Sequence, residues 1–380
     1  MSESVSVMKA LDPRETKLNI LLLAIPLTCY FRYIEHDSTL AFFTSMISIM
    51  PLAFLMGRAT EEIALRTSES LGGLLNATFG NAAEFIIAIF AIFAAYEGIK
   101  NGTPEGSETA ETMVHLVQAS LIGSILGNLL LVLGLAFVWG GIHFEEQEFS
   151  ETQVSSNGSL LLLAVMVLVI PTVFHEAVPG DEGSLGVKNL SHLAALILLA
   201  LYGLFLYFQF KSHSHLFATD GSHNEEPEMT KKNAIRLLVL ATIFVSWMAE
   251  ILVHSVESAA DDVGLPHLFI GVILLPLFGN AAEHFTAVSV AAKNKMDLSF
   301  AIAVGSSTQI AVFVAPLMVV IAWLLDVPLT FEFGILETVS VFLAVMITNL
   351  IAQDGKSNWL EGAMLLGSYA ILGAAFLFHP

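Results

Sequence analysis

The sequence predicts an all-α membrane protein with eleven transmembrane helices, one extra N-terminal helix plus two inverted five-helix repeats. The first reason is composition, because 55% of the 380 residues are hydrophobic and only 13% are charged. A soluble domain carries about a quarter charged residues. The second reason is a series of continuous apolar runs that recur to the last residues. The third is a hexapeptide that occurs twice.

The apolar runs are long enough to cross a hydrocarbon layer about 30 Å thick. Only helices and closed barrels satisfy the backbone in such a layer, and runs that do not alternate in polarity indicate helices. The second run contains Arg58, Glu61 and Glu62, which we place at a membrane surface or in a wet cavity. We expect spans at residues 18–31, 40–64, 71–95, 114–139, 160–174 (extending to about 178), 193–210, 234–256, 268–292, 298–325, 331–351 and 360–378.

The basic residues predict a cytoplasmic N-terminus and, after eleven spans, an external C-terminus. In this orientation only Arg32, Lys100 and Lys188 face outward. The N-terminal residues lack the apolar core and cleavage site of a removable signal peptide. Without an extended N-terminal regulatory region, a prokaryotic plasma membrane is the expected location. Twelve basic residues face the cytoplasm: Lys9, Arg14, Lys17, Arg58, Arg66, Lys211, Lys231, Lys232, Arg236, Lys293, Lys295 and Lys356.

The longest break between spans, residues 211–233, divides the chain into two halves. We interpret this segment either as a flexible cytoplasmic linker or as a low-affinity regulatory metal site, since His and carboxylate groups bind divalent ions. The net charge of −20 either solubilises the loops or concentrates divalent cations at the mouths, and it argues against nucleic acid as a partner. The acidic and histidine residues of the linker are His213, His215, Asp220, His223, Glu225, Glu226 and Glu228.

An internal repeat relates these halves. The hexapeptide FGNAAE stands at residues 79–84 and again at 278–283. The next span of each half then contains a related polar motif, GSILGN at 123–128 and GSSTQ at 305–309. Five spans per repeat is an odd number, so equivalent helices cross in opposite directions, and in such transporters the site lies at the midplane. The expected division is an N-terminal segment with the extra helix (1–34), a first repeat (35–210), the linker (211–233) and a second repeat (234–380).

Each hexapeptide places an amide and a carboxylate on one helical face. Asn81 lies three residues before Glu84, and Asn280 three before Glu283. A carboxylate inside the bilayer costs at least a few kcal/mol and marks a functional site by default. Carboxylate, amide and carbonyl oxygens suit Ca2+, which takes six to eight oxygen ligands. The single cysteine, Cys29, excludes an internal disulfide and a cysteine-rich metal site.

Neighbouring polar residues are candidates for a supporting role. Gly80 and Gly279 permit either a helix break or close helix packing. Glu62 and Glu250 precede the hexapeptides in similar contexts, as do Glu69-Ser70 and Glu257-Ser258, so we expect either entrance and gating acids or surface anchors. Five residues are expected to line the ion pathway, with interhelical hydrogen bonding as the alternative: Ser124, Asn128, Ser306, Gln309 and His284.

The paired acids suggest how two ions could be coupled. Two nearby carboxylates repel and burial disfavours their charged form, so an empty site is expected to take up protons. One Ca2+ or two protons would neutralise the pair equally. A neutral site can change conformation, whereas the doubly charged one resists the change. Ca2+ and H+ are therefore the expected transported ions, and no enzymatic activity is expected.

With these motifs in view, the chain resembles the cation/proton exchanger branch of the Ca2+/cation antiporter superfamily. The resemblance covers the second to eleventh spans and rests on GNAAE at 80–84, GNAAEH at 279–284 and GSSTQ at 305–309. It implies Ca2+/H+ antiport with the two motif glutamates as central ligands. It also implies that the second and seventh spans slide as a gate and that an acidic linker joins the halves. His284 is typical of this branch, whereas Phe85 stands at the equivalent position of the first repeat.

Other functions remain as alternatives. Na+/Ca2+ exchangers of the same superfamily place a further acid in the later helix of the second repeat, where this chain has Ser306 and Gln309. A divalent cation channel would use the same acids but would conduct rather than exchange. An intramembrane hydrolase is suggested by His175-Glu176 and Glu283-His284, which do not form the two-histidine helix motif of a metalloprotease. The lipid bilayer is the expected surrounding, and the oligomeric state is open, a homo-oligomer included.

Overall fold

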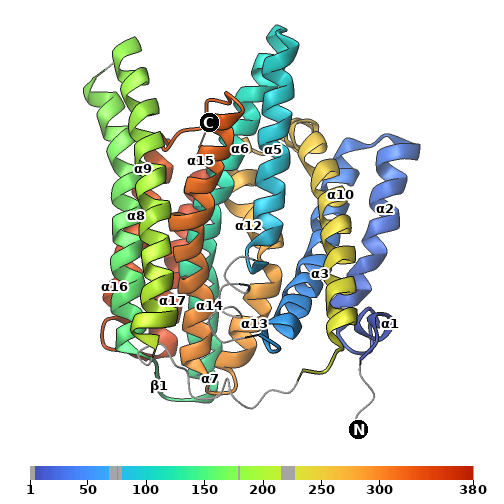
Figure 1. The fold of residues 1–380 in the computed structure, drawn as a ribbon, viewed down its shortest axis with the longest axis vertical. Helices are drawn as coiled ribbons and strands as arrows, with labels where there is room; N and C mark the ends of the chain where they lie inside the picture. The colour runs from blue at the N-terminus through green and yellow to red at the C-terminus, as the bar shows by residue number, and fades with distance from the viewer. Residues whose placement is uncertain (1–4, 68–74, 76–78, 179, 215–226, 380) are drawn as a thin grey trace.

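Long, roughly parallel helices make up the protein in a computed structural model that describes residues 5–67, 75, 79–178, 180–214 and 227–379 (Figure 1). Two very short strands pair as an antiparallel β1–β2 ladder. Turns marked η are 3₁₀- or π-helical. The elements are α1 (Val7–Ala10), η1 (Lys17–Leu23), α2 (Ala24–Tyr30), η2 (Phe31–Glu35), α3 (Ser38–Ala64), α5 (Ala82–Asn101), α6 (Pro104–Leu126), η3 (Gly127–Val132), α7 (Leu133–His143), β1 (Gln147–Glu148), α8 (Glu151–Ala177), α9 (Asp181–Tyr207), η4 (Phe208–Ser212), α10 (Lys231–Val263), α11 (His267–Phe269), η6 (Ile270–Leu274), α12 (Leu275–Gly279), α13 (Ala281–Ala291), α14 (Met296–Gln309), η7 (Ile310–Val314), α15 (Ala315–Leu324), α16 (Ile335–Ala352), β2 (Lys356–Ser357) and α17 (Trp359–Leu377).

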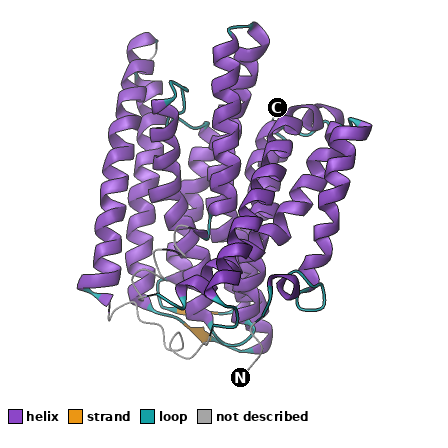
Figure 2. Ribbon diagram, turned by 45° about the vertical axis from the view of Figure 1, so that its right-hand side comes forward, coloured by secondary structure: helices purple, strands orange, loops and turns teal. Residues whose placement is uncertain are grey.

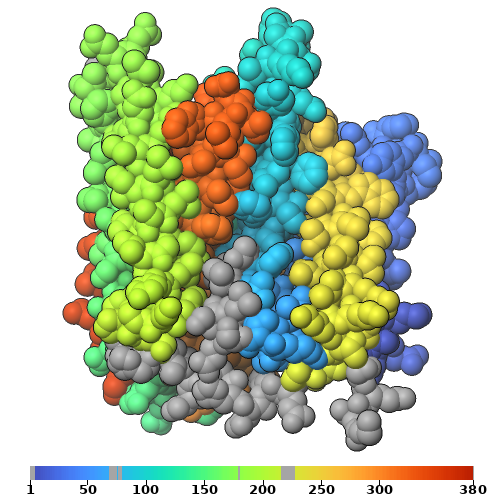
Figure 3. Space-filling model, in the orientation of Figure 1, coloured from blue at the N-terminus to red at the C-terminus, as the bar shows by residue number. Residues whose placement is uncertain are grey.

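The expected number of spans is confirmed for the part of the chain that the structure describes. Ten helical stretches are long and apolar enough to cross a membrane, and one bent pair, α11–α12 with α13, supplies the eleventh. The two chain ends lie at opposite ends of the bundle (Figures 1 and 2). An odd number of crossings produces this arrangement. At the end that carries the C-terminus, the α5–α6 and α8–α9 pairs project beyond their neighbours (Figure 3).

The fifth span begins earlier than we expected, because a capping hydrogen bond sets the start of its helix. We expected it at 160–174, but α8 begins at Glu151, because the Ser150 hydroxyl accepts a hydrogen bond from the amide of Gln153 (3.4 Å). The first two turns are polar, so hydropathy alone missed them. Two of their polar residues, Gln153 and Asn157, are nevertheless buried.

The tenth span begins four residues later than expected. We expected it at 331–351, but α16 begins at Ile335, and the preceding residues 327–333 form a non-helical segment in which Val327, Leu329, Phe331 and Phe333 are buried. The amide of Phe331 donates to Ser191 Oγ of α9 (3.0 Å) and that of Phe333 donates to Thr172 Oγ1 of α8 (3.2 Å). The side chain of Gln118 on α6 donates to the carbonyl of Glu332 (2.7 Å). These polar side chains satisfy a backbone that does not form a helix.

Small residues let the helices approach closely, as expected in a membrane interior. Gly98 of α5 and Gly106 of α6 face each other so tightly that a Cβ on either would collide with the carbonyl oxygen of the other. Gly134 of α7 and Gly362 of α17 make a similar contact. The most extensive pairing joins α3 to α10, the second and seventh spans. These packings fix the frame in which the repeated motifs meet.

Candidate cation-binding site

A helix begins directly after the asparagine of both hexapeptides. Asn81 (φ −97°, ψ 23°) and Asn280 (φ −96°, ψ 8°) are non-helical, and α5 and α13 begin immediately after them. The first helical hydrogen bonds are equivalent too, Phe85 N to Asn81 O and His284 N to Asn280 O, each 3.0 Å. In the second half the bend is 58°. Of the two readings of the motif glycines, the helix break is therefore the one observed.

The break places Glu84 and Glu283 in the first turns of α5 and α13. A helix N-terminus carries a partial positive charge and favours a nearby carboxylate. The two motifs also meet in space, because a Cβ added at Gly279 would lie 3.7 Å from Glu84 Cγ. Of the predicted third span, 71–95, the part from Ala82 onwards is helical, as α5. Residues 71–74 and 76–78 of it lie outside the described residues.

A chain of hydrogen bonds connects the halves beside the acids. Asn81 Nδ2 donates to Gln309 Oε1 (3.0 Å) and Asn81 Oδ1 accepts from Ser306 Oγ (2.7 Å). Ser306 Oγ in turn accepts from Asn128 Nδ2 (3.1 Å). Residues of the first repeat, Asn81 and Asn128, therefore bond directly to residues of the second.

Ser124 completes the group of polar residues expected around the motifs. Its hydroxyl donates to Glu84 Oε1 at 3.4 Å. A π-helical turn lies at the end of each polar motif: η3 begins at Gly127, within the first motif, and η7 begins at Ile310, directly after the second. Such turns are frequent at functional sites, and here they recur at corresponding places in the two halves.

Several buried polar atoms at the motifs have no protein partner among the described residues. They are Asn280 Nδ2, Glu283 Oε2, His284 Nε2 and Asn128 Oδ1. A buried polar atom without a hydrogen bond is costly, so these atoms indicate a ligand or water. Two of them are oxygens of the kind Ca2+ prefers. No cluster of three His, Cys, Asp or Glu side chains with metal-binding geometry is found in the described part, so neutral oxygens would have to supplement the two carboxylates.

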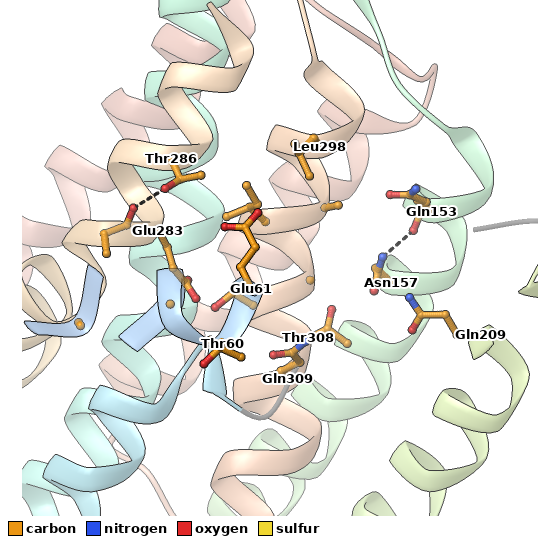
Figure 4. A pocket seen from close by; sticks show the side chains of 18 of the residues that line it. Thr60, Glu61, Gln153, Asn157, Gln209, Glu283, Thr286, Leu298, Thr308 and Gln309 are labelled. Carbon is orange, nitrogen blue, oxygen red and sulfur yellow. Dashed lines mark hydrogen bonds between the residues drawn. The ribbon is translucent and has the colours of Figure 1, made fainter. Parts of the chain in front are cut away.

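A cavity of about 670 Å³ reaches this group (Figure 4). Its walls include Glu283, Ser306 and Gln309, whereas Glu84 is not among the described lining residues. The lining extends through Arg58 of α3 and Leu298 of α14. Arg58 lies near the C-terminal end of α3 and Leu298 near the N-terminal end of α14, and both of these helix ends adjoin the N-terminal end of the bundle (Figure 1). The cavity therefore joins the second motif to the end of the molecule that carries the N-terminus.

Glu62, one of the two acids predicted at the entrance, is not among the described residues that line the cavity. Its side chain is only 5% exposed. Its oxygens accept hydrogen bonds from the amides of Glu228 (2.9 Å) and Met229 (3.0 Å), and Arg66 pairs with it at 3.0 Å. It is absent from the described lining of the cavity, so this geometry matches the alternative of an anchor. Glu250 is exposed on α10 and is likewise not among those lining residues.

The sequence placed Glu61 at a membrane surface or in a wet cavity, but only its neighbour Glu62 was a candidate entrance acid. Glu61 lines the cavity together with Gly57, Arg58 and Thr60, while Glu62 points into the linker contact. Consecutive residues of a helix point in directions that differ by about 100°. Glu61 therefore faces the cavity, while the next residue, Glu62, faces the linker. The signal was available in the spacing of Gly57 and Glu61, which share a helical face. Also missed were Gln153, Asn157 and Gln209, which line the cavity from α8 and η4.

The linker can be compared with expectation only in part. His213 and Glu228 are described, and Glu228 pairs with Arg58 at 3.1 Å. The remaining linker residues named above, from His215 to Glu226, and the predicted echo at Glu69-Ser70 lie outside the described residues. The regulatory metal site and the flexible linker both stay predictions.

Comparisons with known proteins identify the family of this chain. A family model described as sodium/calcium exchanger protein matches residues 37–211 and 233–378. The chain is 43% identical to a Ca2+/H+ antiporter of Aphanothece halophytica, over 95% of this chain and 96% of that protein. The chain belongs to the Ca2+/H+ antiporter branch of this family. The predicted family resemblance is therefore confirmed, and with it a transporter rather than an enzyme.

The chain is also similar to a second relative of this branch and to a solved structure. The chain is 40% identical to vacuolar cation/proton exchanger 3 of Oryza sativa subsp. japonica, over 96% of this chain and 86% of that one. The structure of native YfkE matches with a TM-score of 0.79 at 38% identity, covering 95% of this chain and 100% of that chain. These matches confirm the all-helical membrane fold.

Proposed function

We propose that the protein is a secondary active transporter that exchanges cytosolic Ca2+ for H+ by alternating access, with Glu84 and Glu283 at the centre of the site. The observation that carries this proposal is the meeting of two equivalent broken helices, each with a glutamate in its first turn. Relatives that are named Ca2+/H+ antiporters support the choice of ions.

The motif residues supply the oxygen ligands in this proposal. Glu84 and Glu283 provide the charge that balances Ca2+, and Asn81 and Asn280 provide neutral oxygens. Backbone carbonyls at the helix breaks and water would complete the six to eight ligands that Ca2+ takes. The partial positive charge of the helix N-termini holds the carboxylates in place when the cation has left.

Charge neutralisation couples the two ions. An empty site with two carboxylates repels itself, and burial adds to the cost of that state. One Ca2+ or two protons neutralise the two carboxylates, and the protein can then change between its two orientations. The empty, charged form cannot make this change. Ca2+ therefore moves in one direction only when protons move in the other.

The cavity gives the cytosolic route. Ca2+ enters at the end of the bundle that carries the N-terminus, passes Glu61 and reaches Glu283 on the wall of the cavity. Ser306 and Gln309 lie on the same wall. In the next step the protein changes conformation, so that the site between the two halves opens to the other side of the membrane, as in other inverted-repeat transporters. Glu61 takes over the entrance role that we expected of Glu62.

The test is 45Ca2+ uptake into proteoliposomes that contain purified protein, with an imposed pH gradient and no Na+. We expect uptake that follows the pH gradient and collapses when an ionophore dissipates it. Lowering the pH on both sides should raise the KM for Ca2+, because protons compete for the same carboxylates. Uptake only on addition of Na+, with no response to the pH gradient, would establish the Na+/Ca2+ exchanger alternative. Electrical conduction without exchange would establish a channel.

The orientation and location belong to this proposal as well. The basic residues support a cytoplasmic N-terminus and an external C-terminus. The expected location, a prokaryotic plasma membrane, stays a prediction. Cysteine labelling from outside should reach residues 105–111 and miss Glu228. Labelling of Glu228 from outside would reverse the orientation and the direction of transport.

A further inference from the structure

Two walls of different chemistry face each other across the cytosolic cavity. One carries carboxylates, Glu61 on α3 and Glu283 on α13, and the other carries uncharged amides (Figure 4). We call the second the amide wall and define it as Gln153 and Asn157 of α8 with Gln209 of η4. Thr308 and Gln309 of α14 lie between the two walls in the same view. Nothing in the transport cycle proposed above uses the amide wall.

Two residues of the amide wall, Gln153 and Asn157, are buried yet incompletely bonded, and Gln209 is half-buried. Gln153 is 6% exposed and Asn157 is 8% exposed. Asn157 Nδ2 donates to the backbone carbonyl of Gln153 (3.1 Å), which fixes the side chain and leaves Oδ1 as a free acceptor. Neither this oxygen nor the Gln153 side-chain amide has a protein hydrogen-bond partner in the described part of the chain. Such groups are stable only if water or a ligand satisfies them.

Two other buried amides, those of Gln118 and Gln147, donate hydrogen bonds to backbone carbonyls. Gln118 Nε2 donates to two backbone carbonyls, those of Thr330 and Glu332. Gln147 Nε2 donates to Ala291 O and Asn294 Oδ1. These amides hold irregular backbone in place. The amides of α8 instead line a cavity whose volume is many times the roughly 30 Å³ that one water occupies in the liquid.

We propose that the amide wall binds the hydration shell of an incoming divalent cation and holds the ion beside Glu283 before its water ligands are exchanged. The proposal rests on the proposed function and adds specificity-determining residues to it. The amide oxygens accept hydrogen bonds from metal-bound water, while the carboxylate wall supplies the attraction. An uncharged wall suits this step, because binding must be strong enough to admit the ion and weak enough to release it.

The test replaces Asn157 by leucine, which keeps the branched shape and removes both polar atoms. In Ca2+ uptake by proteoliposomes, we expect the KM for Ca2+ to rise about two- to tenfold, the range that one hydrogen bond provides. The kcat should stay within twofold of wild type, since the carboxylates are untouched. Gln153→Leu should act in the same direction. Asn157→Asp, which restores an oxygen on the wall, should return the KM to the wild-type value or below.

The matched control is Thr172→Val, a polar-to-apolar change on the same helix away from the cavity. It should lower thermal stability in detergent without raising the KM. An unchanged KM in Asn157→Leu overturns the proposal. So does an Asn157→Asp variant whose KM rises as far as that of Asn157→Leu, because that result means packing rather than hydration. Absence of pH-driven Ca2+ uptake in the wild type would instead contradict the proposed function itself.

Discussion

The two hexapeptides have the same six letters and different surroundings. In the first half, Asn81 bonds to both Gln309 and Ser306, and Glu84 accepts from Ser124. In the second half, Asn280 Nδ2 and Glu283 Oε2 lack partners among the described residues, and Glu283 lines the cavity.

This difference teaches how one sequence motif serves two faces of a membrane. An inverted repeat gives each half the same local geometry, and asymmetry enters only when the halves pack in one of two arrangements. Here the second motif places Gly279, Ala282 and Glu283 on the cavity wall, whereas the first contributes Gly80 but not Glu84 among the described residues. The opposite arrangement would exchange these roles.

The largest expected effect comes from removing either acid. Glu84→Gln and Glu283→Gln each leave one carboxylate, so Ca2+/H+ exchange should fall below detection in proteoliposomes. The fold should survive, because a neutral amide costs less to bury than a carboxylate. Size-exclusion profiles and thermal unfolding in detergent supply the control. Wild-type exchange in either variant would remove that glutamate from the site.

Accessibility tests the difference between the halves directly. In a Cys29→Ser background, cysteine at position 306 should react with a membrane-impermeant thiol reagent applied from the cytoplasmic side. Cysteine at the equivalent position 124 should react far more slowly, because Ser306 lines the cavity whereas Ser124 is not among the described lining residues. Equal rates would mean that both motifs are open to the same side and would break the comparison.

A pair of equivalent glycines sharpens the comparison through stability. A Cβ at Gly123 would collide with the carbonyl oxygen of Val272 and with Pro276, whereas a Cβ at Gly305 meets nothing within 4 Å. Gly123→Ala should therefore cost about 1–3 kcal/mol of stability by overpacking. Gly305→Ala should change it little. Thermal unfolding of both variants in detergent measures the contrast, and equal melting temperatures would contradict it.

The smallest effects are expected at the neighbouring acids Glu61 and Glu62. Glu61→Gln removes a charge from the cavity wall, so it should raise the KM for Ca2+ about two- to fivefold, as an electrostatic contribution below 1 kcal/mol implies. Glu62→Gln should mainly lower stability, by about 1–3 kcal/mol, because Arg66 and the linker amides lose a charged acceptor. Titrating Ca2+ uptake and melting both variants separates these outcomes. If the two variants exchange effects, Glu62 is the entrance acid after all.

The sequence alone determined the class of protein, the number of spans and the paired acids. Long apolar runs leave only helices as an option in a bilayer, and the exact repetition of FGNAAE identified residues 79–84 and 278–283. Periodicity and composition are local properties, so they can be read from the chain directly. The polar residues Ser124, Asn128, Ser306 and Gln309 were also correctly grouped with the motifs.

Only the tertiary structure decided which residues face the cavity. The distinction between Glu61 and Glu62 depends on where residues 228 and 229 pack. Segment 327–333 is not helical, and side chains on α6, α8 and α9 satisfy its backbone. The two motifs have identical sequences, yet of the two glutamates only Glu283 is among the described lining residues of the cavity. Their difference arises from packing between the halves, which local sequence does not contain.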